Sequence, residues 1–121
     1  PTRVSFADCY LDDDWRKKAK DNRWLLTEEK SENVINRIKG TAEHPRFIER
    51  VPEGAKFKFL LTFKILQEED GKLFDNVLLK GLKLLEMDAL GGNGSRGYGR
   101  IEFEFDDKEI NEKFKILNPL L

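Results

Sequence analysis

The sequence is poor in the residues that usually build disulfide frameworks and metal centres. Its 121 residues include one cysteine, Cys9, and one histidine, His44. A single cysteine excludes an internal disulfide and favours a reducing compartment, so we expect a cytoplasmic protein. No apolar run approaches the roughly 18 residues of a membrane span, and no signal peptide is visible. We therefore expect no membrane partner.

The sequence also lacks an excess of charge of one sign. Its 22 basic and 23 acidic residues leave a net charge of −1, and the isoelectric point is near 6.0. This balance excludes a nucleic-acid binder that acts through a global basic field, so any polyanion site must be a local patch. The length predicts a single domain. The chain opens on Pro1 rather than methionine, which fits a processed protein or a fragment.

Two stretches have the composition of strands. Residues 3–11 are short, aromatic and β-branched. In residues 57–66 the odd-numbered positions are apolar and most even-numbered ones are polar, a period of two that predicts a half-buried strand. Residues 12–30 read as a polar, partly helical connection. Their aspartates, Asp12–Asp14, are better explained as a solvated turn than as a metal site.

Residues 31–52 are a charged segment interrupted by Gly40 and Pro45. Such interruptions favour a protruding hairpin or loop over a core element. After a turn at Asp70-Gly71, residues 72–90 change to a helical period, with an apolar stripe made of Phe74, Val77, Leu78, Leu82, Leu85 and Ala89.

Glycines mark two positions of this predicted helix. Gly81 lies on the stripe and would let the helix approach a sheet closely, and Gly91 or Gly92 would end the helix as a left-handed cap. Residues 101–105 alternate again and predict the last regular element, a strand, before an irregular tail.

The loop between this helix and this strand concentrates glycine. The stretch "ALGGNGSRGYGRIEF", residues 89–103, holds five glycines within nine positions and a G-x-G-x-x-G pattern. A dinucleotide-binding fingerprint follows a strand and opens a helix. Here a helix enters the loop, and the partial charge of its C-terminus repels phosphate. No Gly-Lys-Ser/Thr follows either, so dinucleotide and P-loop sites are both excluded.

Residues 96–103 also approach the RNP1 signature of an RNA-recognition motif, with Arg100 where an aromatic is expected. No partner RNP2 strand is visible, and base stacking needs that platform. Two interpretations are left: glycines that serve only turning and packing, or exposed amides that bind an anion with help from Asn93, Ser95, Arg96 and Arg100. We favour the second, a site for the RNA backbone. Tyr98 is open to base stacking or to packing.

Two stretches together resemble one family. "ENVINRIKGTAEHPRFIERVPEGAKFKF" and "LLEMDALGGNGSRGYGRIEF" are similar to the RAMP superfamily of CRISPR effector proteins, and within it to the repeated backbone subunit of the type III-A (Csm) interference complex. The resemblance covers residues 2 to about 105. It implies an α+β, ferredoxin-like (RRM-like) fold: a palm from which residues 31–52 project as a thumb hairpin.

The resemblance further implies that residues 1–121 form only the second half of that palm. Its second strand, third strand, second helix and fourth strand would be residues 3–11, 57–66, 72–90 and 100–105. The first strand and first helix would be missing. Because that sheet has the order 4-1-3-2, an empty slot would expose unpaired backbone groups, and the helix would leave leucines uncovered. We expect a companion segment or chain to supply the missing half.

The function that the resemblance implies is RNA binding within a CRISPR complex. Family members hold a guide RNA, cleave target RNA with a divalent metal (Mg or Mn), and assemble with further copies of themselves and other Csm subunits. Their catalytic aspartate lies in the first half and matches no position here, so we assign no catalytic or metal-binding residue. The implied RNA-binding residues are Gly91, Gly92, Gly94, Ser95, Arg96, Gly97 and Gly99 in the loop, and Arg37, Arg46 and Arg50 in the thumb.

Two other functions stay open. A stand-alone RAMP endoribonuclease that processes precursor CRISPR RNA would need a histidine near the scissile phosphate, and His44 is the sole candidate. A non-catalytic scaffold subunit would need only the RNA-binding loop.

Overall fold

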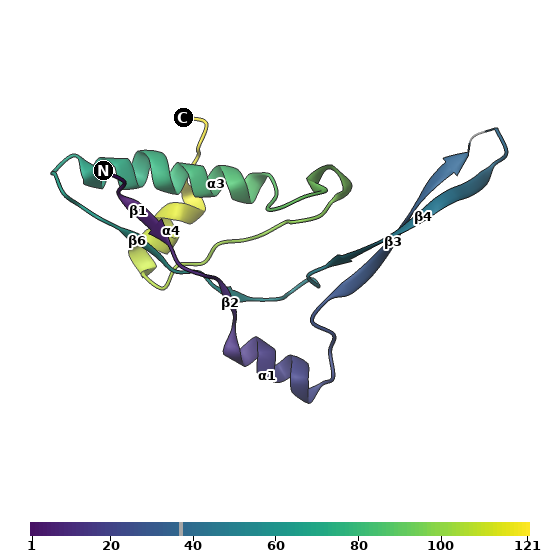
Figure 1. Ribbon diagram of the computed structural model, residues 1–121. Coiled ribbons are helices and arrows are strands. Elements are labelled where there is room, and N and C mark those ends of the chain that lie inside the picture. The colour runs from purple at the N-terminus through teal and green to yellow at the C-terminus, as the bar shows by residue number, and fades with distance from the viewer. Residues whose placement is uncertain (37) are drawn as a thin grey trace. The chain divides into compact units, whose positions relative to one another are not determined.

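The computed structural model describes residues 1–36 and 38–121, and for residues 32–36 and 41–46 it describes the backbone alone (Figure 1). The chain forms two compact units. One comprises residues 1–5 and 61–121, and the other comprises residues 6–60. Both mix helices with small antiparallel sheets, so the predicted α+β class is confirmed.

In the unit of residues 6–60, the predicted polar connection contains helix α1, Asp13–Asp21. The Asp12 carboxylate caps its N-terminus by accepting the Trp15 amide at 3.1 Å, and Asp13 and Asp14 occupy the first turn. Acidic side chains are favourable there because they complement the helix dipole. The aspartate run that we expected to be a solvated turn is therefore the start of a helix.

The same unit holds a long hairpin. Strands β3, Glu28–Asn36, and β4, Thr41–Arg50, pair antiparallel from Glu28 opposite Arg50 to Asn36 opposite Thr41. Figure 1 shows them as one extended two-stranded ribbon. Pro45 lies inside β4, and proline is tolerated in a strand at a sheet edge. The hairpin prediction is confirmed, and the first strand begins earlier than residue 31.

Each predicted long strand is broken in two. Residues 3–11 give β1, Val4–Phe6, and β2, Tyr10–Leu11; residues 57–66 give β5, Phe57–Lys58, and β6, Leu61–Phe63. β1 pairs with β6, and β2 pairs with β5. Leu11 lies opposite Phe57, whereas the Ala7 amide donates to the Leu60 carbonyl at 3.0 Å. Between these two contacts, the segment from Ala7 to Leu11 advances four residues, while the segment from Phe57 to Leu60 advances three. This bulge-like offset separates the two ladders.

The unit of residues 1–5 and 61–121 is organised around a helical run. Its parts are α2, Asp70–Leu73, the π-helical η1, Phe74–Leu79, and α3, Lys80–Met87. The predicted turn at Asp70-Gly71 is therefore the first helical turn, and the helix ends at Met87 rather than at residue 90.

The π-helical turn changes which side chains face the core. Leu82 is buried as predicted, but Leu79 is only 1% exposed and was not on the predicted stripe, whereas Val77 was on it and is 63% exposed. A π turn takes more residues than an α turn, so it moves the residues after it to a different face. Gly81 is exposed, and a Cβ there would meet nothing within 4 Å, so the close approach to a sheet predicted for it is wrong.

The segment after the glycine loop also differs from the prediction. Residues 101–105 are not part of any sheet in the described chain, and a further helix follows, α4, Lys108–Ile116. Asp107 caps α4 by accepting the Ile110 amide at 3.0 Å. Phe114 is 1% exposed, and its ring centroid lies 5.1 Å from that of Phe105 and 6.0 Å from that of Phe103. The last regular element is therefore a helix.

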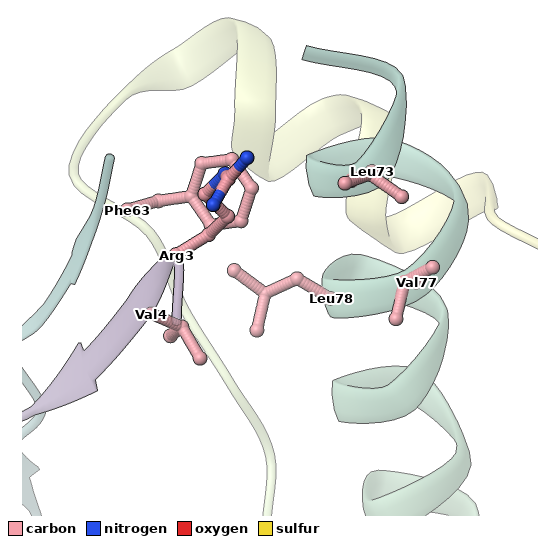
Figure 2. A pocket seen from close by; sticks show the side chains of 6 residues that line it. All are labelled: Arg3, Val4, Phe63, Leu73, Val77 and Leu78. Atoms are coloured by element: carbon pink, nitrogen blue, oxygen red, sulfur yellow. The ribbon is translucent and has the colours of Figure 1, made fainter. Parts of the chain in front are cut away.

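An apolar cleft lies between the β1–β6 pair and the helical run. Figure 2 shows Arg3, Val4 and Phe63 on one side and Leu73, Val77 and Leu78 on the other, around a cavity of about 190 Å³. Across the described residues, every helix is too short or too polar to cross a membrane.

Candidate nucleic-acid interface

The glycine loop is closed at its base by one backbone contact. The Leu90 amide donates to the Gly99 carbonyl at 2.8 Å. A Cβ on Gly99 would lie 2.0 Å from the Leu90 carbonyl oxygen, and the φ of Gly99 is +78°. Both facts require glycine at this position, since any side chain would force the backbone segments at Leu90 and Gly99 apart. Gly99 therefore holds the loop together.

The tip of the loop is a single 3-10 turn, Gly94–Arg96, between two left-handed residues, Asn93 and Gly97. The Arg96 amide donates to the Asn93 carbonyl at 2.9 Å, and the Gly97 amide donates to the Gly94 carbonyl at 3.0 Å.

Several amides at this tip are available to an external acceptor. Within the described chain, no backbone or side-chain acceptor bonds the amides of Gly92, Gly94 and Ser95, and residues 90–97 are all exposed. Consecutive amides in a tight turn form the kind of concavity that binds an anion.

Gly94 and Gly92 differ in the space that is available to an added side chain. A Cβ on Gly94 would lie 3.0 Å from the Ala89 Cβ, which is a tight contact, whereas a Cβ on Gly92 would meet nothing within 4 Å. Gly92 also has no left-handed φ. The fold of the described residues thus gives no reason for glycine at this position.

Of the two roles open for Tyr98, base stacking and packing, the structure favours packing. Its side chain is 6% exposed and belongs to the core of its unit, together with Leu79, Leu82 and Phe114. A side chain so enclosed has no ring face open for stacking on a base.

Of the three predicted thumb arginines, the side chain of Arg50 lies within the described structure. Arg50 pairs through its Nε with the Glu28 carboxylate, which lies directly opposite in the hairpin. Arg37 lies outside the described residues, as do the side chains of Arg46 and His44. The loop residues, in contrast, share one continuous turn.

One buried carboxylate escaped the sequence prediction. Asp70 is 2% exposed, and its Oδ2 accepts the Leu66 amide at 2.7 Å, the Gln67 amide at 2.9 Å and the Arg3 Nε at 2.9 Å. Burial raises the pKa of Asp70, but these three donors more than compensate, and its pKa lies below the ordinary value. No signal in the sequence pairs Arg3 with a residue so distant. Asp70 ties the start of the helical run to the first strand.

The described part of the chain brings no three histidine, cysteine, aspartate or glutamate side chains together as a metal site. We derive no cleavage step from these residues.

Comparison with known proteins decides the family. The model of the RAMP superfamily matches residues 2–102. The chain belongs to the RAMP superfamily. The predicted resemblance is thus confirmed at the level of the family, and the glycine loop lies within the part of this RAMP chain that the match covers.

This RAMP chain is also similar to curated proteins named CRISPR system Cms endoribonuclease Csm3. It is 47% identical to the one from Methanocaldococcus jannaschii over 105 residues, which is 85% of this chain and 40% of that protein. The Streptococcus thermophilus protein is 43% identical over 71% of the chain and 44% of its own length. The Mycobacterium tuberculosis protein is 42% identical over 64% of the chain and 38% of its own length. The chain thus spans about two fifths of these relatives.

Proposed function

We propose that this RAMP chain is the RNA-binding part of a Csm3-type backbone subunit in a type III-A CRISPR interference complex. The observation that carries the proposal is the identity of 47% over 85% of the chain with a protein named endoribonuclease Csm3. In this role the chain holds a guide RNA, meets target RNA, and assembles in the cytoplasm with copies of itself and other Csm subunits.

The glycine loop is the guide-binding element in this proposal. The amides of Gly92, Gly94 and Ser95 would donate to phosphate oxygens, and the exposed Arg96 would add charge. Gly91, Gly97 and Gly99 shape the turn. Arg37, Arg46 and Arg50 of the hairpin would contact RNA as well, Arg50 by exchanging Glu28 for a phosphate.

We also propose that the chain is the second half of a ferredoxin-like palm, and that a companion segment completes it. Two features support this. The described chain offers no acceptor to the amides of Glu102 and Glu104 along one side of the extended segment. The helical run exposes Val77, which lines the apolar cleft, and also Leu84. A strand would satisfy the amides, and an apolar helix would fill the cleft.

The relatives are longer than the part that this chain matches. The companion segment would correspond to the part of the relatives that lies outside the match. Target cleavage, its catalytic aspartate and its Mg or Mn ion belong to that segment in the proposal. In the proposal, the described residues bind RNA and position it.

Replacement of Gly92 by valine tests the loop directly. A side chain here has room in the folded chain, so we expect an unchanged melting temperature. Binding of a fluorescent CRISPR RNA, followed by anisotropy, should fall at least tenfold, because the side chain would block the approach of phosphate to the amides.

Gly81→Val provides the matched control, since that glycine also has free space around it but lies outside the loop. Guide affinity equal to that of the unmodified protein in Gly92→Val would contradict a backbone-amide site in the loop.

A further inference from the structure

Helix α1 is a rigid element fixed at both ends. Asp12 caps its start. At its end, the Arg23 amide donates to the Lys20 carbonyl at 3.2 Å and the Trp24 amide donates to the Ala19 carbonyl at 2.7 Å. This bond pair is the usual left-handed C-terminal cap of a helix. Ala19 is 1% exposed, and the Trp15 and Trp24 rings lie 6.2 Å apart.

The residue in the left-handed position of this cap is unusual. Glycine is preferred there because a Cβ makes the conformation unfavourable. Here the position holds Arg23, with φ of 56°. The helix therefore carries an arginine where stability alone would favour glycine.

Arg16, Lys20 and Arg23 form a row of exposed cations along helix α1 and its C-terminal cap. Arg16 and Lys20 stand at positions i and i+4 and share a helix face, and Arg23 follows just past the helix end, at the left-handed position. Neighbouring like charges at these spacings repel one another. Arg16 and Lys20 are roughly 6 Å apart along the helix axis, at 1.5 Å per residue.

The described residues provide no carboxylate partner for this row. None of its three cations takes part in an ion pair there, and the nearby Asp13 lies 3.9 Å from Lys58 instead. The helix dipole favours cations in the last turn of a helix. It explains Lys20 no better than Lys18, which is also in the last turn but lies away from the row. The dipole gives no reason for Arg16 or for arginine at the left-handed position.

We propose that Arg16, Lys20 and Arg23 form a second contact for the phosphate backbone of RNA, independent of the glycine loop. The inference rests on the proposed function, because a polyanion already belongs to it. A row of cations with no partner matches a chain of phosphates better than a single anion. A membrane surface fits less well, because a helix that lies in lipid must present its apolar face, and the Ala19 face of α1 is buried in the protein.

The test compares the variant Arg16→Gln/Lys20→Gln/Arg23→Gly with Lys18→Gln, in the purified protein. Affinity for a labelled single-stranded RNA is measured across a range of salt concentrations. Each phosphate contact contributes about 0.7 to the slope of log affinity against log salt, so the row variant should lower the slope by about two. Lys18→Gln should leave both the slope and the affinity nearly unchanged.

The single variant Arg23→Gly separates binding from a structural role. Glycine relieves the left-handed strain, so the melting temperature should rise while RNA affinity falls. A residue that serves only to hold the helix would change both in the same direction. A rise in stability with unchanged RNA affinity would overturn the assignment of Arg23.

The outcomes distinguish this inference from the proposed function. If RNA binds, Gly92→Val lowers the affinity at least tenfold and the row variant behaves as Lys18→Gln does, then the second contact is refuted and the loop stands. If the unmodified protein binds no RNA, both fail. If the row variant loses binding to phosphatidylserine vesicles but not to RNA, the row serves a membrane and the inference is overturned.

Discussion

Asp70 shows how a single carboxylate can be buried and still be ionised. Three donors converge on one of its oxygens, and they hold its pKa below the ordinary value of about 3.9. A group with a lowered folded pKa contributes stability above its unfolded pKa, and this contribution is lost as the pH falls through the folded value.

We therefore expect the free energy of unfolding to fall as the pH is lowered below about 4. Asp70→Asn should be less stable than the unmodified protein at pH 7 and should lack this part of the pH dependence. Chemical denaturation at a series of pH values measures both effects. Glu69→Gln, an exposed neighbour, is the control. An Asp70→Asn protein with the same acid slope as the unmodified protein would show that another group is responsible.

Gly99 illustrates a different kind of residue constraint. The closing contact of the loop leaves 2.0 Å between an added Cβ and the Leu90 carbonyl oxygen. Gly99→Ala should therefore lower the melting temperature and RNA affinity together, because the base of the loop must open. Gly92→Val, in contrast, should lower affinity alone. Thermal melts and anisotropy on the same samples distinguish the two, and an unaffected melt in Gly99→Ala would contradict this closure.

Phe114 is the side chain of helix α4 that is buried in the described structure. Phe114 packs against Phe103 and Phe105, and the Lys83 ammonium lies 4.8 Å from the centroid of its ring. Truncation of a buried phenylalanine to alanine typically costs about 3–5 kcal/mol, so Phe114→Ala should destabilise its unit by about that amount. Ile116→Ala on the same helix is the control, since Ile116 is 85% exposed. Equal denaturation midpoints for the two variants would rule out this attachment.

The elements also show where sequence patterns stop being informative. Alternation at residues 101–105 correctly separates Phe103 and Phe105, which pack on α4, from the exposed Glu102 and Glu104. A strand also needs a neighbouring strand to pair with, and alternation in the sequence does not show whether residues 101–105 have one. The bulge between the two short ladders and the π turn are one-residue events, which a periodicity averaged over ten residues does not detect.

Helix α4 could have been found from the sequence. Asp107 is a favourable N-cap residue, Ile110 and Phe114 follow at helical spacing, and Pro119 lies just beyond the end. For the loop, the glycine pattern and the helix that precedes it were sufficient to exclude a dinucleotide. The pattern does not distinguish Gly99, which the fold requires, from Gly92, which it does not, because the difference depends on which backbone atoms lie near each residue.

For the molecule as a whole, the proposed companion segment leads to a residue-resolved prediction. Hydrogen exchange of the chain by itself should be slow at the amides of Phe103 and Phe105 and fast at those of Glu102 and Glu104, since the described residues supply acceptors to the first two alone. Assembly with the companion segment should slow exchange at Glu102 and Glu104. A cooperative melt of the isolated chain as a soluble monomer, with these two amides already protected, would show the proposed topology to be wrong.

The two acceptors on this segment have a consequence for assembly. The Glu86 carboxylate accepts the Phe103 amide at 2.9 Å, and the Asn111 side chain accepts the Phe105 amide at 3.0 Å. One side of the extended segment is thus occupied by side chains, which cannot be extended into a further strand. In the proposed assembly this segment can therefore pair with one strand only, on the side of Glu102 and Glu104, and a second strand cannot add to the segment on its other side.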